Sequence, residues 1–286
     1  MTPGEPNLDL IFTLQCQDQP GIVHAVTAAI LASGGNIIEN QQFTDPESNI
    51  FVMRTRFATQ IGKIEAENFL NVELHKFHPT TSLREYSQKK RALVLVTTES
   101  HCLRELLFLS ELEELPIEII SVVSNQLQLK DLVESHRINF IHLPLATIGK
   151  EMAEKDLLKL VADEEIDFLI LARYMQILSE NFCNKLPGKI INIHHSFLPG
   201  FKGAKPYHQA HARGVKIIGA TAHFVTPDLD EGPIIEQDVA HVNHSVSPED
   251  LIAIGRDIER RVLAKAVRLF AEDRIFVVGQ RTVIFN

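Results

Sequence analysis

The chain has 286 residues, of which 45% are hydrophobic and 23% charged, a composition typical of a globular protein with room for two domains. Its net charge of −9, without a basic stripe, argues against nucleic acid as a partner. Three widely spaced cysteines outside any CxxC pattern, and the lack of a signal peptide or a membrane-spanning apolar run, predict a cytoplasmic protein without membrane contact.

The first 86 residues predict a small domain of alternating strands and helices. Apolar residues recur at helical spacing in two stretches, and β-rich runs separate them. The predicted order is βαββαβ, the ferredoxin-like arrangement. The expected elements are strand 8–16, helix 22–32, a hairpin of 37–43 and 49–57, helix 63–76 and strand 82–86.

Two glycine-containing turns in this segment resemble those of ACT domains, which are small regulatory modules that bind amino acids. The first turn runs from Asp18 to Gly21, and the second contains Gly35 and Asn36. Glycine exposes backbone amides, and a following helix N-terminus attracts a carboxylate. The resemblance implies a regulatory domain over residues 1–86 with these four residues at the effector site. The alternative is a folded spacer whose glycines only satisfy turns.

Residues 87–90 are polar and charged, which favours a linker, and residues 91–286 then alternate strands with helices. The strands are apolar throughout, as in a parallel sheet that is covered on both faces. We therefore predict a Rossmann-like, mostly parallel open sheet in an α/β protein. The expected strands are 92–97, 117–123, 138–143, 168–172, 275–278 and 282–285, and the expected helices are 101–111, 128–135, 150–164 and 248–270.

The stretch Asn192–Gly203 concentrates polar, reactive side chains at the end of an apolar strand predicted over Lys189–His194. Strand periodicity places Asn192 and His194 on one side of that strand. An amide N–H and a protonated imidazole suit a carbonyl substrate, because both can stabilise an oxyanion. The alternative is structural, with Asn192 capping a turn and His194 an ordinary histidine at a strand end.

A base is expected downstream, in the acidic loop that follows the strand containing His223. Asp230 in this loop could pair with a protonated His194 and take a proton from water. His223 lies seven residues earlier and could orient that carboxylate or the water.

The motif NIHHSFLPGFKGAKPYHQA, followed by GATAHFVTPDLDEGPIIEQD, resembles the folate-dependent formyltransferase and hydrolase superfamily, and most closely its formyltetrahydrofolate deformylases. The resemblance spans residues 91–286 and implies Asn192, His194 and Asp230 as catalytic residues, with His223 and Ser196 in support. It implies hydrolysis of 10-formyltetrahydrofolate to formate and tetrahydrofolate without a cofactor or metal. Gly200 departs from the alanine expected in these enzymes, which should only loosen the turn.

The same resemblance implies further partners and roles. Glycine and methionine are the implied effectors, and ACT modules associate, so a homo-oligomer, a tetramer or dimer of dimers, is expected. The formate would supply purine synthesis and balance one-carbon folate pools. The implied pterin-binding segment follows the strand that ends at Ala172, and the loop 226–232 forms the opposite wall. The folate-binding residues are then Arg173, Met175, Gln176, Ile177, Leu178, Asp228 and Gly232.

The sequence of the loop Thr97–Cys102 favours hydrolysis over transfer of the formyl group to a phosphorylated amine. It has no glycine to bind phosphate, whereas related glycinamide ribonucleotide formyltransferases carry a Gly-Ser-Asn turn there, and Glu99 would repel a phosphate. Formyl transfer to another small amine, or folate binding without turnover, stays open as an alternative. A zinc site is disfavoured, because no HExxH motif organises the five candidate histidines, His194, His195, His208, His211 and His223.

Overall fold

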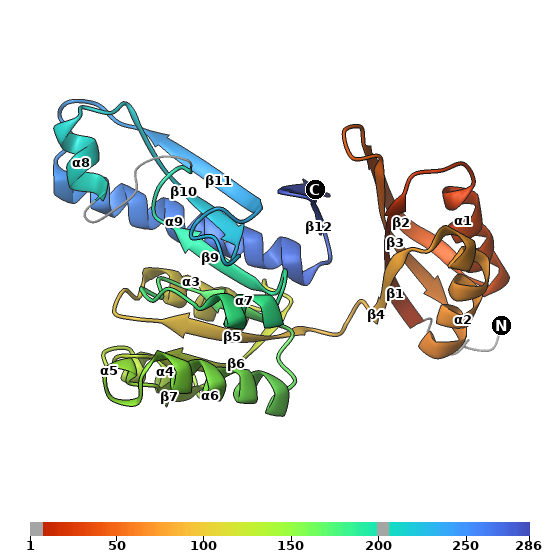
Figure 1. Ribbon diagram of the computed structural model, residues 1–286, viewed down its shortest axis with the longest axis horizontal. Coiled ribbons are helices and arrows are strands. Elements are labelled where there is room, and N and C mark those ends of the chain that lie inside the picture. Colours follow the sequence, from red (N-terminus) through yellow and green to blue (C-terminus); the bar gives the residue numbers. More distant parts are fainter. Residues whose placement is uncertain (1–7, 199–205) are drawn as a thin grey trace. The chain divides into compact units, whose positions relative to one another are not determined.

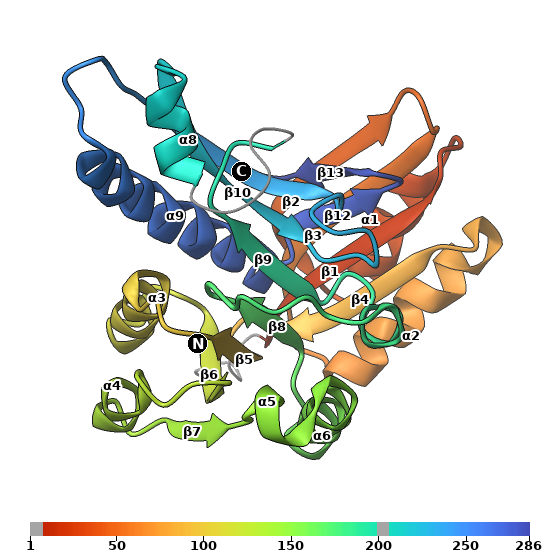
Figure 2. The same cartoon turned by 60° about the vertical axis from the view of Figure 1, so that its left-hand side comes forward.

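The computed structural model describes residues 8–198 and 206–286, so Gly200 lies outside the described residues. It divides the chain into two compact units (Figures 1 and 2). The first unit comprises Met1–Lys89 together with Asp273–Asn286, and the second comprises Lys90–Glu272. Within the described ranges, no helix is both long enough and apolar enough to cross a membrane.

The first unit confirms the predicted βαββαβ order. Its four strands form an antiparallel sheet in the order β2-β3-β1-β4. Alternate residues of β1 and β3 pack with the apolar sides of the two helices, which gives this unit its own core. The elements are β1 (Leu8–Gln17), α1 (Ile22–Ala32), β2 (Asn36–Asp45), β3 (Ile50–Thr59), α2 (Lys63–Leu74), a 3₁₀ turn (His75–Phe77) and β4 (Thr80–Glu85).

The C-terminal hairpin belongs to this first unit, which corrects the prediction that residues 91–286 form one domain. Strands β12 (Ile275–Val278) and β13 (Arg281–Ile284) pair with each other and pack Phe276 and Phe285 against Val52. Without the hairpin, the apolar side chain of Val52 on this face of the sheet would be exposed to water, so burial favours the association.

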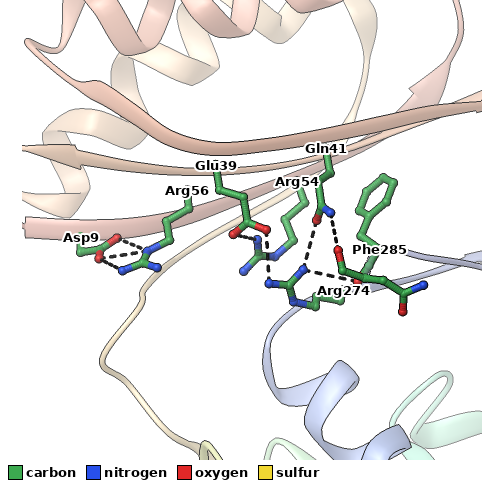
Figure 3. Close-up of polar contacts among 8 residues, drawn as sticks. Asp9, Glu39, Gln41, Arg54, Arg56, Arg274 and Phe285 are labelled. Atoms are coloured by element: carbon green, nitrogen blue, oxygen red, sulfur yellow. Dashed lines mark hydrogen bonds and ion pairs between the residues drawn. The ribbon is translucent and has the colours of Figure 1, made fainter.

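Polar contacts fix the hairpin on the same face (Figure 3). Arg274 contacts Glu39 at 3.2 Å and Gln41 at 3.2 Å, and Glu39 also pairs with the buried Arg54 at 2.9 Å. The Gln41 amide donates to the backbone carbonyl of Asn286 at 2.7 Å. One carboxylate thus pairs with two guanidinium groups, one from each part of the chain.

The second unit is the predicted open sheet, in the order β11-β10-β9-β8-β5-β6-β7. Strands β9, β8, β5, β6 and β7 run parallel to one another. Strand β10 pairs antiparallel with β9, and β11 pairs antiparallel with β10 at the edge of the sheet. This confirms a Rossmann-like, mostly parallel sheet. The strands are β5 (Lys90–Val96), β6 (Ile117–Ser124), β7 (Asn139–His142), β8 (Phe168–Leu171), β9 (Ile190–His194), β10 (Ile217–Phe224) and β11 (Ile234–His241).

Helices cover both faces of this sheet (Figures 1 and 2). On one face α9 packs on α3 and on β9, β10 and β11, and its Phe270 ring lies 4.6 Å from that of Phe168 in β8. Leu169 and Leu171 point to the other face, where Leu157 and Phe182 cover them. The helices are α3 (His101–Glu111), α4 (Lys130–Ser135), α5 (Leu145–Ile148), α6 (Lys150–Asp163), α7 (Glu180–Lys185), α8 (Pro206–Ala212) and α9 (Pro248–Ala271).

Candidate active site

A cavity of about 260 Å³ lies at the carboxyl ends of β8 and β9. Three segments line it: the one after β8, the end of β9, and the loop after β10. Open α/β sheets bind ligands in this position, outside the carboxyl ends of their strands. The three segments are those in which the sequence predicted the folate-binding and catalytic residues.

Asn192 and His223 are direct cross-strand partners in β9 and β10, so their side chains lie on the same face of the sheet. The His223 ring donates through Nδ1 to the carbonyl oxygen of Phe224 at 2.9 Å. Its Nε2 therefore accepts a hydrogen bond from Asn192 Nδ2 at 3.2 Å, and burial lowers the pKa of His223, which favours this neutral form. The contact fixes the orientation of the Asn192 amide and leaves its second N–H unengaged by His223.

His194 lies two residues further along β9, on the side that Asn192 occupies, as strand periodicity predicts. Its Nδ1 is 3.4 Å from Asp230 Oδ2, and Asp230 Oδ1 is 3.7 Å from His223 Nε2. The hydrogen bond from His194 lowers the pKa of Asp230 although burial opposes this shift. Asp230 therefore lies between both histidines as an ionised carboxylate.

Asp230 reaches this position because its loop turns back toward the sheet. Its φ of 57° is in the left-handed region, which aspartate tolerates better than most residues. Asp230 lies within a turn that is closed by a hydrogen bond from the Glu231 amide to the Asp228 carbonyl at 3.3 Å.

Two ring nitrogens of the histidine pair have no hydrogen-bond partner among the described residues although both are buried. They are His194 Nε2 and His195 Nδ1. The two rings meet edge to face, with centroids 4.8 Å apart, and both line the cavity. Buried polar atoms are normally paired, and exceptions gather where a ligand or a reaction uses them.

The predicted pterin-binding segment lines the cavity in full. Met175 and Ile177 expose 57% and 61% of their surface, while Leu178 is buried, so the two exposed side chains present an apolar wall. The backbone amide of Met175 donates to Thr97 Oγ1 at 3.0 Å, which ties the segment to the end of β5. Arg173 and Gln176 complete the predicted set in the lining.

Three predicted site residues are not in the lining formed by the described residues. Asp228 lies between the lining residues Pro227 and Leu229, and Gly232 follows the lining part of the same loop. Ser196 is buried beside Thr221. Gly232 has a packing reason instead, because a Cβ there would overlap the backbone carbonyl of Phe224. Sequence reasoning did not identify His195 as a lining residue, although its place beside His194 was a signal.

A buried carboxylate that sequence reasoning also missed lies beside this cavity. Glu259 in α9 is 1% exposed and accepts hydrogen bonds from His101 Nε2 and Tyr207 Oη, both at 2.8 Å. Its Oε2 is also 3.5 Å from Nε of Arg173, which lines the cavity. Helical spacing gave a signal, because Glu259 falls between the buried Gly255 and Val262 on the core side of α9.

Two ion pairs join α9 to α3 and to the loop before α3. Glu99 contacts Arg256 at 2.9 Å, and Arg260 contacts Glu105 at 3.3 Å. The acidic Glu99 in the glycine-free loop therefore already has a cationic partner.

Among the described residues, one group could in principle ligate a metal, and it is not the predicted set of histidines. His101, Cys102 and Glu259 place their ligand atoms within 4.8 Å of one another. The direct 2.8 Å contact between His101 and Glu259 is too short for both atoms to ligate one ion as they stand, and Arg173 adds a cation beside the carboxylate. The expected lack of a metal or cofactor stays a prediction.

The chain matches known proteins over nearly its whole length. Residues 90–267 match the model of the formyl transferase family. The formyltetrahydrofolate deformylase of Corynebacterium sp. (strain P-1) is 45% identical over 96% of this chain and 98% of its own, and that of Bacillus subtilis is 46% identical over 96% and 92%. The crystal structure of the deformylase from Burkholderia mallei, 42% identical, superposes with a TM-score of 0.94 over 98% of this chain and 100% of that chain. This chain belongs to the formyltetrahydrofolate deformylase family.

Proposed function

We propose that the protein hydrolyses 10-formyltetrahydrofolate to formate and tetrahydrofolate. The observation that carries this proposal is the position of Asp230, 3.4 Å from His194 and 3.7 Å from His223, in a cavity that Asn192 also lines. A carboxylate, an imidazole and an oriented amide in one cavity supply a base and two oxyanion donors for attack of water on a carbonyl.

The proposed reaction needs one water and no other reactant. Asp230 takes a proton from water as the water oxygen bonds to the formyl carbon. Asn192 and a protonated His194 donate hydrogen bonds to the oxygen that becomes negatively charged. The carbon–nitrogen bond then breaks, and the proton held by Asp230 passes to the departing nitrogen. Formic acid leaves, loses its acid proton to solvent as formate, and tetrahydrofolate remains.

The folate ring would bind against the segment Arg173–Leu178. Met175 and Ile177 are exposed toward ligands or solvent, and large exposed apolar side chains beside a cavity favour a flat aromatic ligand. The backbone groups of the segment would supply hydrogen bonds to the ring. The loop from Thr226 to Asp230 would form the facing wall, with Asp228 and Gly232 shaping it.

The first experiment measures formate release by the purified protein from 10-formyltetrahydrofolate and water alone. The parent should form formate, and Asp230→Asn should lose roughly 10²- to 10⁴-fold in turnover, the range expected for a general base. The matched control is Asp238→Asn, which removes an exposed carboxylate that pairs with Arg261 on the surface. Undiminished formate release by Asp230→Asn would refute the assignment of the base. No formate from a folded parent would favour an amine-dependent transferase or a folate-binding protein.

The first unit is proposed to be an ACT domain that senses amino acids, with glycine and methionine as candidate effectors. Asp18 and Gly21 lie before α1, whereas Gly35 and Asn36 lie after it, and an 11-residue helix is about 16 Å long. One amino acid could contact both pairs only if a second copy contributes, which supports the proposed homo-oligomer, a tetramer or dimer of dimers. Light scattering with formate assays at increasing glycine and methionine would test both proposals.

In a cell, the reaction would release formate for purine synthesis and would balance the one-carbon folate pools. The three cysteines are free and buried, which supports the proposed cytoplasmic location. Deleting the gene should then make growth depend on added purines under conditions in which formate limits purine synthesis.

A further inference from the structure

Glu259 places a carboxylate where burial alone would oppose its charge. It is 1% exposed, yet its pKa is lowered: burial raises it, but the hydrogen bonds from His101 and Tyr207 and the charge of Arg173 outweigh that effect. These partners come from α3, α8 and the segment after β8. A buried carboxylate is maintained only when its partners satisfy it.

Arg173 is the partner that connects Glu259 to the cavity. It is a non-glycine residue with a φ of 64°, a conformation that costs about 1 kcal/mol or more and persists only where the surroundings impose it. Its side chain is 15% exposed, and its Nε lies 3.5 Å from Glu259 without a hydrogen bond to any described residue. The surroundings thus impose the backbone conformation of Arg173, and the buried ion pair with Glu259 holds its guanidinium at the cavity wall.

The positive charge of Arg173 disfavours protonation of the neighbouring His195. Burial, the Arg173 charge and the neighbouring His194 lower the pKa of His195 to about 4, while Glu259 and Asp230 oppose this shift. These four side chains are the charged or titratable groups that act most strongly on His195. Two adjacent protonated imidazoles would repel each other, so a neutral His195 places no competing charge beside His194, which faces Asp230.

We infer that Glu259 is a positioning residue of the hydrolysis site, which holds the Arg173 guanidinium at the cavity wall and through it keeps His195 neutral beside His194. The inference rests on the proposed function for its catalytic consequence, but its electrostatic part concerns the free protein.

The first test follows His195 in the ligand-free protein by NMR titration of the imidazole signals, assigned with His195→Gln. Arg173→Gln removes the charge and keeps an unbranched side chain at the strained position, so the pKa of His195 should rise by at least about 0.5 unit. Arg173→Lys keeps the charge and should retain the low value. An unchanged His195 titration in Arg173→Gln would overturn the inference.

The second test compares the pH profiles of kcat/KM for formate release. Glu259→Gln leaves the Arg173 charge without its counter-ion, which disfavours imidazole protonation, so the alkaline limb should move to lower pH by at least about 0.5 unit. Arg173→Gln should move it to higher pH. The control Asp257→Asn removes an exposed carboxylate of α9 that pairs with Arg260 and should reproduce the parent profile.

The two shifts must be opposite in sign, and shifts of the same sign, or none, would overturn the inference. If Glu259→Gln does not fold, Arg173→Gln still tests it, because Glu259 then keeps His101 and Tyr207 as partners. If the folded parent releases no formate, the proposed function fails, and the NMR titration still decides the electrostatic role of Arg173.

Discussion

Asp230 and Glu259 are both carboxylates beside histidines, and each has a lowered pKa, but their surroundings differ. The side chain of Asp230 is 17% exposed in a loop at the cavity, and its nearest histidine contacts are 3.4 and 3.7 Å long. That of Glu259 is 2% exposed on a helix and accepts two hydrogen bonds of 2.8 Å. A carboxylate whose acceptors are all engaged can only position its partners, whereas a loosely engaged one can still accept a proton.

The largest expected effect is on stability, when each of the two carboxylates is replaced by alanine in a separate variant. Glu259→Ala leaves the buried Arg173 charge and His101 unpaired, so it should lower the free energy of unfolding by about 3–5 kcal/mol. Asp230→Ala should cost less than about 1 kcal/mol, because its contacts are longer and more exposed. Denaturant unfolding of the second unit, followed by a probe in α9, measures both. Equal losses would remove the distinction between the two carboxylates.

Asn192→Ala tests the chemistry of the cavity that contains Asp230, because it removes a proposed oxyanion donor and its effect is measured as turnover. Loss of one oxyanion donor should reduce kcat roughly 10²- to 10³-fold while the melting temperature changes little. Asn71→Ala, at an exposed position of α2, is the control for a change of asparagine alone. A large rise in KM with kcat unchanged would contradict an oxyanion role for Asn192 and favour substrate binding.

The arrangement of the end of β9 could be predicted because it follows from strand periodicity. The apolar residues before Asn192 predict the strand, and a period of two puts His194 on the same side. The approach of Asp230 could not be derived in this way, since it depends on a loop that reverses at a positive φ. The acidic loop made Asp230 a candidate base, and the family resemblance implied its catalytic role. Long-range contacts of loops are set by packing that local patterns do not encode.

The C-terminal hairpin and Glu259 show two other limits of local patterns. The apolar residues of 275–285 suit a strand in any sheet, so their place in the first unit depends on contacts such as Phe276 with Val52. Helical spacing places Glu259 on the core side of α9, but the partners that satisfy its buried carboxylate come from three other segments, which the local pattern does not reveal. The hairpin that was assigned to the wrong unit and the carboxylate that was missed both lie where tertiary contacts decide the environment.

One glycine packs near each carboxylate, and replacing each with alanine should lower the stability of the protein by different amounts. A Cβ on Gly232 would overlap the carbonyl of Phe224, a backbone atom that cannot move freely, in the loop that carries Asp230. A Cβ on Gly255 would overlap the side chain of Tyr207, which can rotate away at the cost of its bond to Glu259. Gly232→Ala should therefore cost about 3 kcal/mol and Gly255→Ala about 1 kcal/mol. Thermal melting measures both, and a reversed order would contradict this account.

His195→Gln should have the smallest effect on the free energy of unfolding, and only at acidic pH. The folded pKa of His195 is about 4, mainly because of burial, and its unfolded value is about 6.5. Between these values the unfolded chain binds more protons, so the contribution of a neutral His195 is complete above pH 6.5 and is lost as pH falls toward 4. His223 has the same sign, since burial lowers its pKa too. Below about pH 4 the carboxylates also titrate, so the window from pH 7 to 5 isolates the histidines.

In that window the parent should lose about 1–2 kcal/mol of unfolding free energy through His195, since one pKa unit corresponds to about 1.4 kcal/mol and partial exposure reduces the effect. His195→Gln should show a correspondingly shallower pH dependence, measured by denaturant unfolding at each pH. His223→Gln should flatten it too, but at a cost at pH 7, because it breaks the bond to Asn192. A slope unchanged in His195→Gln would mean that folding does not change the pKa of His195, which would contradict the lowering attributed to burial and to Arg173.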